Sequence, residues 1–114
     1  YFPLDDKRKE QISLGQLLSM SAGLKGMNPV YAKGERQTWD GPTIDNGPWS
    51  TTDDFAMKQA LWCAPGECYS YSTATSHIPA MIVRKVSGME MEEYMRRHLT
   101  GPLGFGTWGY AMYR

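Results

Sequence analysis

The sequence contains two cysteines and two histidines. These residue types most readily bind metals, and cysteines also do thiol chemistry. Cys63 and Cys68 enclose Ala-Pro-Gly-Glu, a wider spacing than the Cys-x-x-Cys of redox sites and most zinc knuckles. We therefore expect two free thiols in or near the core, with a local disulfide across the Pro65–Gly66 turn as the alternative. His77 and His98 have no acidic or thiol partner at ligand spacing, so the sequence predicts no metal site.

Serine nucleophiles are the next chemistry to consider. None of the eight serines is followed by lysine at the third position, so the Ser-x-x-Lys nucleophile motif is absent from these 114 residues. Gly-x-Ser-x-Gly, the other common serine motif, is absent as well. We therefore expect no serine nucleophile of either kind in this chain.

The elements that would position functional side chains are mainly helices. Ser13 and Gln16 form a capping-box pattern that begins a helix over about 13–21. A second helix is expected over about 51–62, because acidic residues in its first turn suit the helix dipole. A third begins with its cap at Thr75 or Ser76, so that Pro79 falls in the first turn, and ends at Gly88. A fourth is expected over about 90–99.

Between the first two helices the hydrophobic periodicity disappears. Residues 23–50 are rich in glycine and proline and contain Trp39 and Trp49, which predicts a long loop. Such a loop is either functional or packed against the core through its two indole rings. The aromatic tail, residues 105–114, is able to begin a strand but requires a pairing partner.

Charge and composition exclude several classes of protein. Twelve Lys and Arg balance twelve Asp and Glu, so the chain lacks the excess of positive charge expected of a nucleic-acid-binding module. The charged run at residues 5–10 cancels itself and is interpreted as a solvated segment. No apolar stretch approaches the length of a membrane span. With 41% hydrophobic residues, the chain is able to build one core, and its length allows one domain.

Three blocks occur here in an order that points to a known family. They are Ile12–Leu24, then Pro65–Thr73 with the helix that ends Arg-Lys-Val-Ser-Gly88, and then Met91–Gly104. Together they resemble the middle segment of the serine β-lactamase-related hydrolases, which include class C β-lactamases, D-alanyl-D-alanine carboxypeptidases and esterase relatives. The resemblance implies the helical lobe of an α+β, penicillin-binding-protein-like fold.

The resemblance also implies roles for two residues. Tyr71-Ser72-Thr73 occupies the place of the family's Tyr-x-Asn motif, which implies that Tyr71 is the general base, or part of a Lys–Tyr base pair, that activates the nucleophilic serine. A phenol is a poor base at neutral pH unless a cation stabilises the phenolate. Thr73 departs from the family's Asn and offers one hydroxyl in contact with substrate or lysine. That departure favours ester or peptide substrates over β-lactams.

The missing motifs imply an incomplete domain. The Ser-x-x-Lys helix is absent, and so is the sheet that carries Lys-Thr-Gly or His-x-Gly, so we expect residues 1–114 to be inactive alone and to associate. The presumed larger protein would act by acyl transfer on an ester, amide or β-lactam carbonyl of a small molecule or peptide. The resemblance implies no cofactor, and it suggests an exported or periplasmic location. The alternative is a stand-alone helical binding module that uses Trp39, Trp49, Trp108 and Tyr110.

Overall fold

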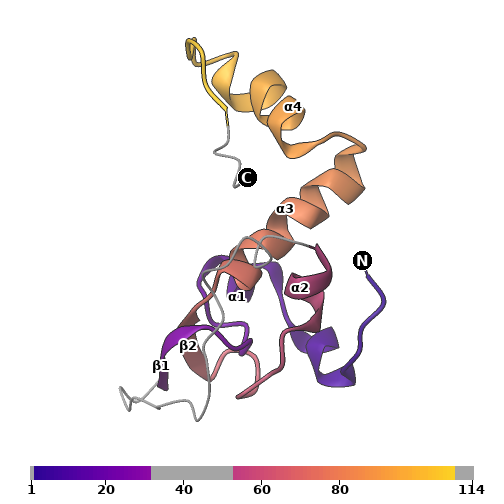
Figure 1. Ribbon diagram of the computed structural model, residues 1–114, viewed down its shortest axis with the longest axis vertical. Coiled ribbons are helices and arrows are strands. Elements are labelled where there is room, and N and C mark those ends of the chain that lie inside the picture. Colours follow the sequence, from indigo (N-terminus) through magenta and orange to yellow (C-terminus); the bar gives the residue numbers. More distant parts are fainter. Residues whose placement is uncertain (1, 32–52, 110–114) are drawn as a thin grey trace. The chain divides into compact units, whose positions relative to one another are not determined.

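The structure is a computed structural model that describes residues 2–31 and 53–109 (Figure 1). The described chain is mainly helical, as the sequence predicted. It divides into two compact units, residues 2–79 and the residues from 80 onward. No helix within the described ranges combines the length and the apolar character that a membrane span requires.

The first unit begins with a short 3-10 helix, η1, at Lys7–Gln11. Asp6 caps it by accepting a hydrogen bond from the backbone N–H of Arg8. Lys9 is buried, and its Nζ donates to Asp5 Oδ1 at 2.6 Å and to the carbonyl oxygen of Met57 at 2.7 Å. The prediction of a fully solvated segment was therefore wrong at Lys9, because a carboxylate and a carbonyl replace the water around its ammonium group.

Helix α1 spans Leu14–Leu18 and has the predicted capping box. The backbone N–H of Gln16 donates to Ser13 Oγ, and the Gln16 side chain accepts from the Ser13 N–H. The helix is shorter than the predicted 13–21, because Met20 adopts a left-handed conformation with φ 59°. The N–H groups of Met20 and Ser21 donate to the carbonyls of Leu17 and Gln16, which closes the helix as a Schellman motif.

A strand replaces part of the expected loop. Strand β1, Met27–Tyr31, pairs antiparallel with β2, Cys68–Tyr71 (Figure 1). The register places Met27 opposite Tyr71. The prediction of a loop over 23–50 was thus wrong for residues 27–31, and the rest of it from residue 32 lies outside the described residues. The pairing explains the difference, since β2 supplies hydrogen bonds that no local pattern within 23–50 reveals.

Helix α2 spans Asp53–Lys58, which is shorter than the predicted 51–62. The chain beyond it is used in a second pairing. Lys25 N–H donates to the carbonyl of Ala60, and Trp62 N–H donates to the carbonyl of Gly23. Because these backbone groups bond across the chain, they are not available for further helical turns.

Cys63 and Cys68 form a disulfide, so the prediction of two free thiols was wrong. Their Cα atoms are 6.4 Å apart, within the range that disulfides span. The turn between them brings them together: Glu67 N–H donates to the carbonyl of Ala64, and Gly66 adopts φ 92°, which a side chain disfavours. The pairing therefore depends on the local turn and does not require the Cys-x-x-Cys spacing of redox sites.

Helix α3 spans Thr73–Ser87 and begins earlier than predicted. Ser72 rather than Thr75 or Ser76 precedes the first turn, and its Oγ accepts from the N–H of Thr75 at 3.1 Å. Pro79 consequently lies inside the helix, where its ring nitrogen donates no backbone hydrogen bond. The predicted end at Gly88 is confirmed.

The second unit continues with α4, Met91–Met95, and a π-helical turn, η3, at Arg96–Thr100. The predicted helix over 90–99 is confirmed, with its last part wound as a π-turn. Residues 105–109 form no strand, and the end of the predicted strand segment lies outside the described residues. The Arg96 guanidinium lies over the Trp108 ring, 4.8 Å from its centroid, and also donates to the Trp108 carbonyl.

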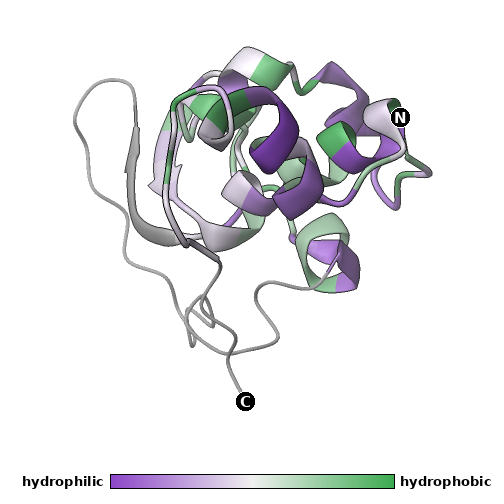
Figure 2. Ribbon diagram, turned by 90° about the horizontal axis from the view of Figure 1, so that it is seen from above, coloured by the Kyte–Doolittle hydropathy of each residue, from purple (hydrophilic) through white to green (hydrophobic). Residues whose placement is uncertain are grey.

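The described core is small and belongs mostly to the first unit. Hydrophobic and hydrophilic residues are mixed along the helical ribbons in Figure 2, and α4 contributes no buried residue. The buried apolar residues of the first unit are Leu17, Ala22, Leu24, Ala56, Cys68 and Ala74. Four of these six are alanine or cysteine, so little apolar area is buried per residue.

Candidate active site

The junction between β2 and α3 carries the residues that the sequence singled out. Side chains in β2 alternate between buried and exposed. Cys68 and Ser70 point inward, whereas Tyr69 and Tyr71 are 44% and 54% exposed on the opposite face. Tyr71 is the last residue of the strand, and Thr73 is the first residue of the helix. The structure therefore places both predicted site residues within one strand-to-helix turn.

Ser72 fixes this turn. Its side chain is completely buried, and its Oγ and carbonyl oxygen accept from the N–H groups of Thr75 and Ser76. Consecutive side chains point in opposite directions here. Tyr71 therefore lies at the surface, whereas the next residue, Ser72, points inward and caps α3. The phenol thus projects from the N-terminal end of a 15-residue helix.

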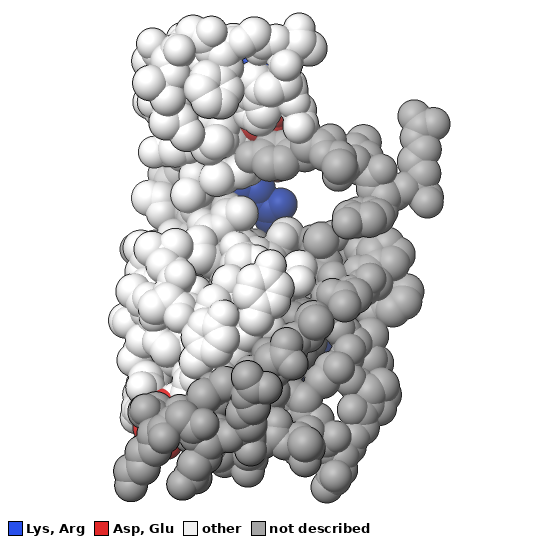
Figure 3. All heavy atoms as spheres, turned by 90° about the vertical axis from the view of Figure 1, so that its left-hand side faces the viewer, with Lys and Arg blue, Asp and Glu red and all other residues white. Residues whose placement is uncertain are grey.

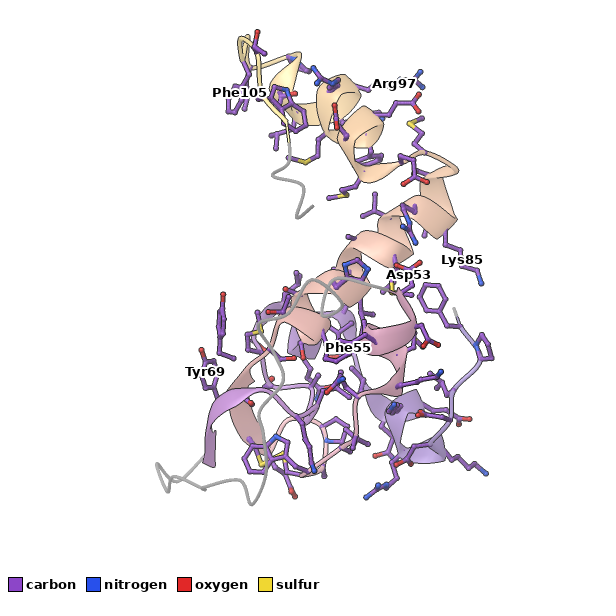
Figure 4. The ribbon with its side chains drawn as sticks, viewed as in Figure 1. Asp53, Phe55, Tyr69, Lys85, Arg97 and Phe105 are labelled. Carbon is purple, nitrogen blue, oxygen red and sulfur yellow. A yellow bond between two sulfur atoms is a disulfide. The ribbon has the colours of Figure 1, made fainter. Side chains whose placement is uncertain are left out.

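The Tyr71 side chain forms no hydrogen bond or ion pair with a charged group of the described residues. Within the described part of the chain, the Tyr71 hydroxyl has no hydrogen-bond partner and contacts no cation. Tyr69 lies on the left in Figure 4, and that side faces the viewer in Figure 3, where the described surface is mostly uncharged apart from one group of Lys or Arg atoms and a few Asp or Glu atoms. A cation that stabilises a phenolate at this position would have to come from outside the described residues.

An acid–imidazole pair joins His77 of α3 to Asp53 of α2, and sequence reasoning missed it. His77 Nε2 is 2.7 Å from Asp53 Oδ1, and Figure 4 shows Asp53 at the start of α2, beside α3. His77 follows Thr73 by four residues, one helical turn. The two partners are 24 residues apart, so no local spacing signals their contact. No cluster of three potential metal ligands occurs among the described residues.

Of the four aromatic residues that the alternative binding module requires, the structure describes one. Trp39, Trp49 and Tyr110 lie outside the described residues. Trp108 is half-buried and stacked under Arg96, so its ring is already occupied within its own unit. The structure therefore describes no aromatic cluster of the kind that this alternative requires.

Comparison with known proteins gives the family. The model of the family described as Beta-lactamase matches residues 1–111, so the chain belongs to the beta-lactamase family. Its mainly helical structure is consistent with a helical segment of that family's fold. The relationship is to a family of serine hydrolases. No curated protein and no solved structure matches the chain.

Proposed function

We propose that this chain supplies the tyrosine-bearing part of a serine hydrolase that acts by acyl transfer through an acyl-enzyme. The observation that supports the proposal is the position of Tyr71, exposed at the end of β2 and directly before the capped start of α3. A phenol at the junction between a strand and a helix has a well-defined backbone position, which suits it to exchange protons with a neighbouring group. The substrate carbonyl belongs to an ester, an amide or a β-lactam.

The proposed reaction assigns Tyr71 one proton in each direction. As phenolate, it takes the proton of the attacking serine hydroxyl, and a bond forms between the serine oxygen and the carbonyl carbon. As phenol, it returns that proton to the leaving group when the scissile bond breaks. Water then hydrolyses the acyl-enzyme. The serine and the lysine cation that stabilises the phenolate belong to a Ser-x-x-Lys segment outside these 114 residues.

Thr73 is proposed to contact the substrate or that lysine. It begins α3 two residues after Tyr71, where the family motif has Asn. Its hydroxyl is both a donor and an acceptor, but it has a shorter reach than the side-chain amide of Asn. It also has one hydrogen to donate, whereas the amide has two. We therefore propose an ester or peptide-like amide, rather than a β-lactam, as the better substrate.

The test is Tyr71→Phe in the complete enzyme that joins this chain to its Ser-x-x-Lys segment, with p-nitrophenyl acetate as substrate. Loss of a general base lowers kcat by about 100-fold to 10,000-fold. Tyr69→Phe is the matched control, because Tyr69 has similar exposure on the same face of β2. If Tyr71→Phe keeps kcat within about threefold of the unmodified enzyme, Tyr71 is not the base. The isolated chain should hydrolyse neither this ester nor a chromogenic cephalosporin.

A further inference from the structure

Met20 is the only described residue other than glycine that has a positive φ. A left-handed backbone is unfavourable for a residue with a side chain, and glycine usually occupies this position of a Schellman motif. Such a conformation persists where the surrounding structure requires it. Here the Met20 carbonyl accepts a hydrogen bond from the N–H of Ser70 at 3.1 Å. The turn that ends α1 is thereby bonded to the residue directly before Tyr71.

Gly26, the residue directly before β1, approaches the same segment. A Cβ atom at Gly26 would lie 2.7 Å from Ser72 Cβ and 2.8 Å from Ser70 Oγ, and it would be closer still to the Tyr71 carbonyl oxygen. Ser70 and Ser72 are both buried, so neither can move aside without disturbing the core. The backbone at Gly26 therefore fits against residues 70–72 only because no side chain is present.

These two contacts matter because they act on the backbone that carries the phenol. The Tyr71 side chain is half-exposed, and its hydroxyl has no partner in the described part of the chain. The position of the ring is then set by the position of its own backbone. β1 and Gly26 hold residues 70–72 by strand pairing and close packing, and Met20 adds the hydrogen bond to Ser70.

We propose that Met20 and Gly26 are positioning residues for Tyr71, acting through the backbone of residues 70–72. This inference rests on the proposed role of Tyr71 as the base. Proton transfer requires the donor and acceptor to lie within hydrogen-bond reach, and a misplacement of about 1 Å can cost about 100-fold in rate. Neither residue touches the reacting atoms in this proposal.

The first test is Gly26→Ala in the complete enzyme with p-nitrophenyl acetate as substrate. The expected result is a fall in kcat of about 10-fold to 100-fold with KM changed by less than about threefold, because the base is displaced while the substrate contacts remain. Gly15→Ala is the matched control. A Cβ at Gly15 has only Ser13 Oγ nearby, at 3.9 Å, so that variant should keep kcat. Leu17→Ala controls for lost stability, since it removes a buried side chain of α1.

A second pair of variants keeps the proposal testable if Gly26→Ala fails to fold. Met20→Gly removes the conformational cost and preserves the carbonyl, so kcat should be unchanged. Met20→Val places a β-branched side chain where φ is positive, which should rotate the carbonyl away from Ser70 and lower kcat by about 10-fold. Amide exchange at Ser70, read by mass spectrometry or NMR, should accelerate in Met20→Val only.

The outcomes separate the two proposals. If Tyr71→Phe abolishes turnover while Gly26→Ala and Met20→Val both keep kcat within about threefold, the positioning role is wrong and the proposed function stands. If Tyr71→Phe itself retains turnover, both proposals fail. If Leu17→Ala lowers kcat as much as Gly26→Ala at equal stability, the effect of Gly26 is general destabilisation, and its positioning role is rejected.

Discussion

His77 Nε2 lies 2.7 Å from Asp53 Oδ1, and this hydrogen bond joins the second turn of α3 to the first turn of α2. The imidazole is 21% exposed and the carboxylate 44%, so solvent screens the pair only in part. Because α3 also begins with the Tyr71–Thr73 turn, the pair anchors the helix on which the candidate site is built.

A double-mutant cycle on this pair should detect the anchor. Asp53→Asn and His77→Gln should each lower the free energy of unfolding by about 1 kcal/mol, with a coupling energy of similar size. Urea unfolding followed by circular dichroism measures both. Asp54→Asn is the control, because Asp54 and Lys58 form an exposed ion pair for which a few tenths of a kcal/mol is expected. A coupling energy near zero would contradict the anchor.

Reducing the Cys63–Cys68 disulfide should lower the free energy of unfolding by about 2 kcal/mol, as expected for the closure of a short loop. Urea unfolding with and without a reductant measures this change. The double variant Cys63→Ser with Cys68→Ser should match the reduced protein and ignore the reductant. Thiol titration of the unfolded, unreduced chain should find no free thiol. Two titratable thiols in that experiment would contradict the disulfide.

The ionisation of Asp6 should make the stability of the N-terminal segment depend on pH in the acid range. The Arg8 side chain, followed by the Arg8 backbone N–H, lowers the pKa of Asp6 from 3.8 to about 2. A lowered pKa in the folded state stabilises the fold above the ordinary value, and that contribution is lost as the pH falls from about 4 through about 2. NMR titration of the Asp6 carboxyl should give a midpoint near 2.

Arg8→Gln is the control for this titration. It removes the guanidinium whose hydrogen bonds to Asp6 are 2.6–3.1 Å long, so the pKa of Asp6 should return toward its ordinary value. High salt should have a smaller effect in the same direction, because both groups are accessible to solvent. An unchanged midpoint in Arg8→Gln would show that the backbone N–H alone accounts for the shift.

Thr73→Asn should change substrate preference in the complete enzyme. An amide at the start of α3 reaches farther than a hydroxyl and places its donor and acceptor on separate atoms, so hydrolysis of a chromogenic cephalosporin should rise about 10-fold relative to p-nitrophenyl acetate. Thr73→Ser keeps the hydroxyl and should leave the ratio of the two kcat/KM values unchanged. An equal ratio in all three proteins would mean that residue 73 does not discriminate between these substrates.

Local features of the fold were predictable from the sequence, and long-range ones were not. The Ser13–Gln16 capping box and the stop at Gly88 depend on residues within one or two turns, and both predictions are confirmed. The predicted start of α3 is wrong because Ser72 caps the helix, which begins at Thr73 and accommodates Pro79 in its interior. β1 and the His77–Asp53 pair depend on contacts between segments far apart in the sequence, which no local periodicity encodes.

Some residues of the candidate site were likewise indicated by the sequence, and others were not. The resemblance located Tyr71 and Thr73, and the structure puts both at one junction, while their chemical roles stay predictions. Met20 gave no signal in the sequence, because methionine is not a residue that predicts a left-handed turn. Gly26 was one glycine among many, and only its distance to residues 70–72 distinguishes it.

The cross-link between Cys63 and Cys68 has a consequence for how the protein is made. Only five positions separate these cysteines, and within residues 1–114 each has only the other as a possible partner. The bond can form as soon as the turn at Pro65–Gly66 has left the ribosome or translocation channel, before β1 and β2 have paired. Formation of the bond requires an oxidant, and synthesis in a reducing compartment yields a chain whose second strand starts without its tether.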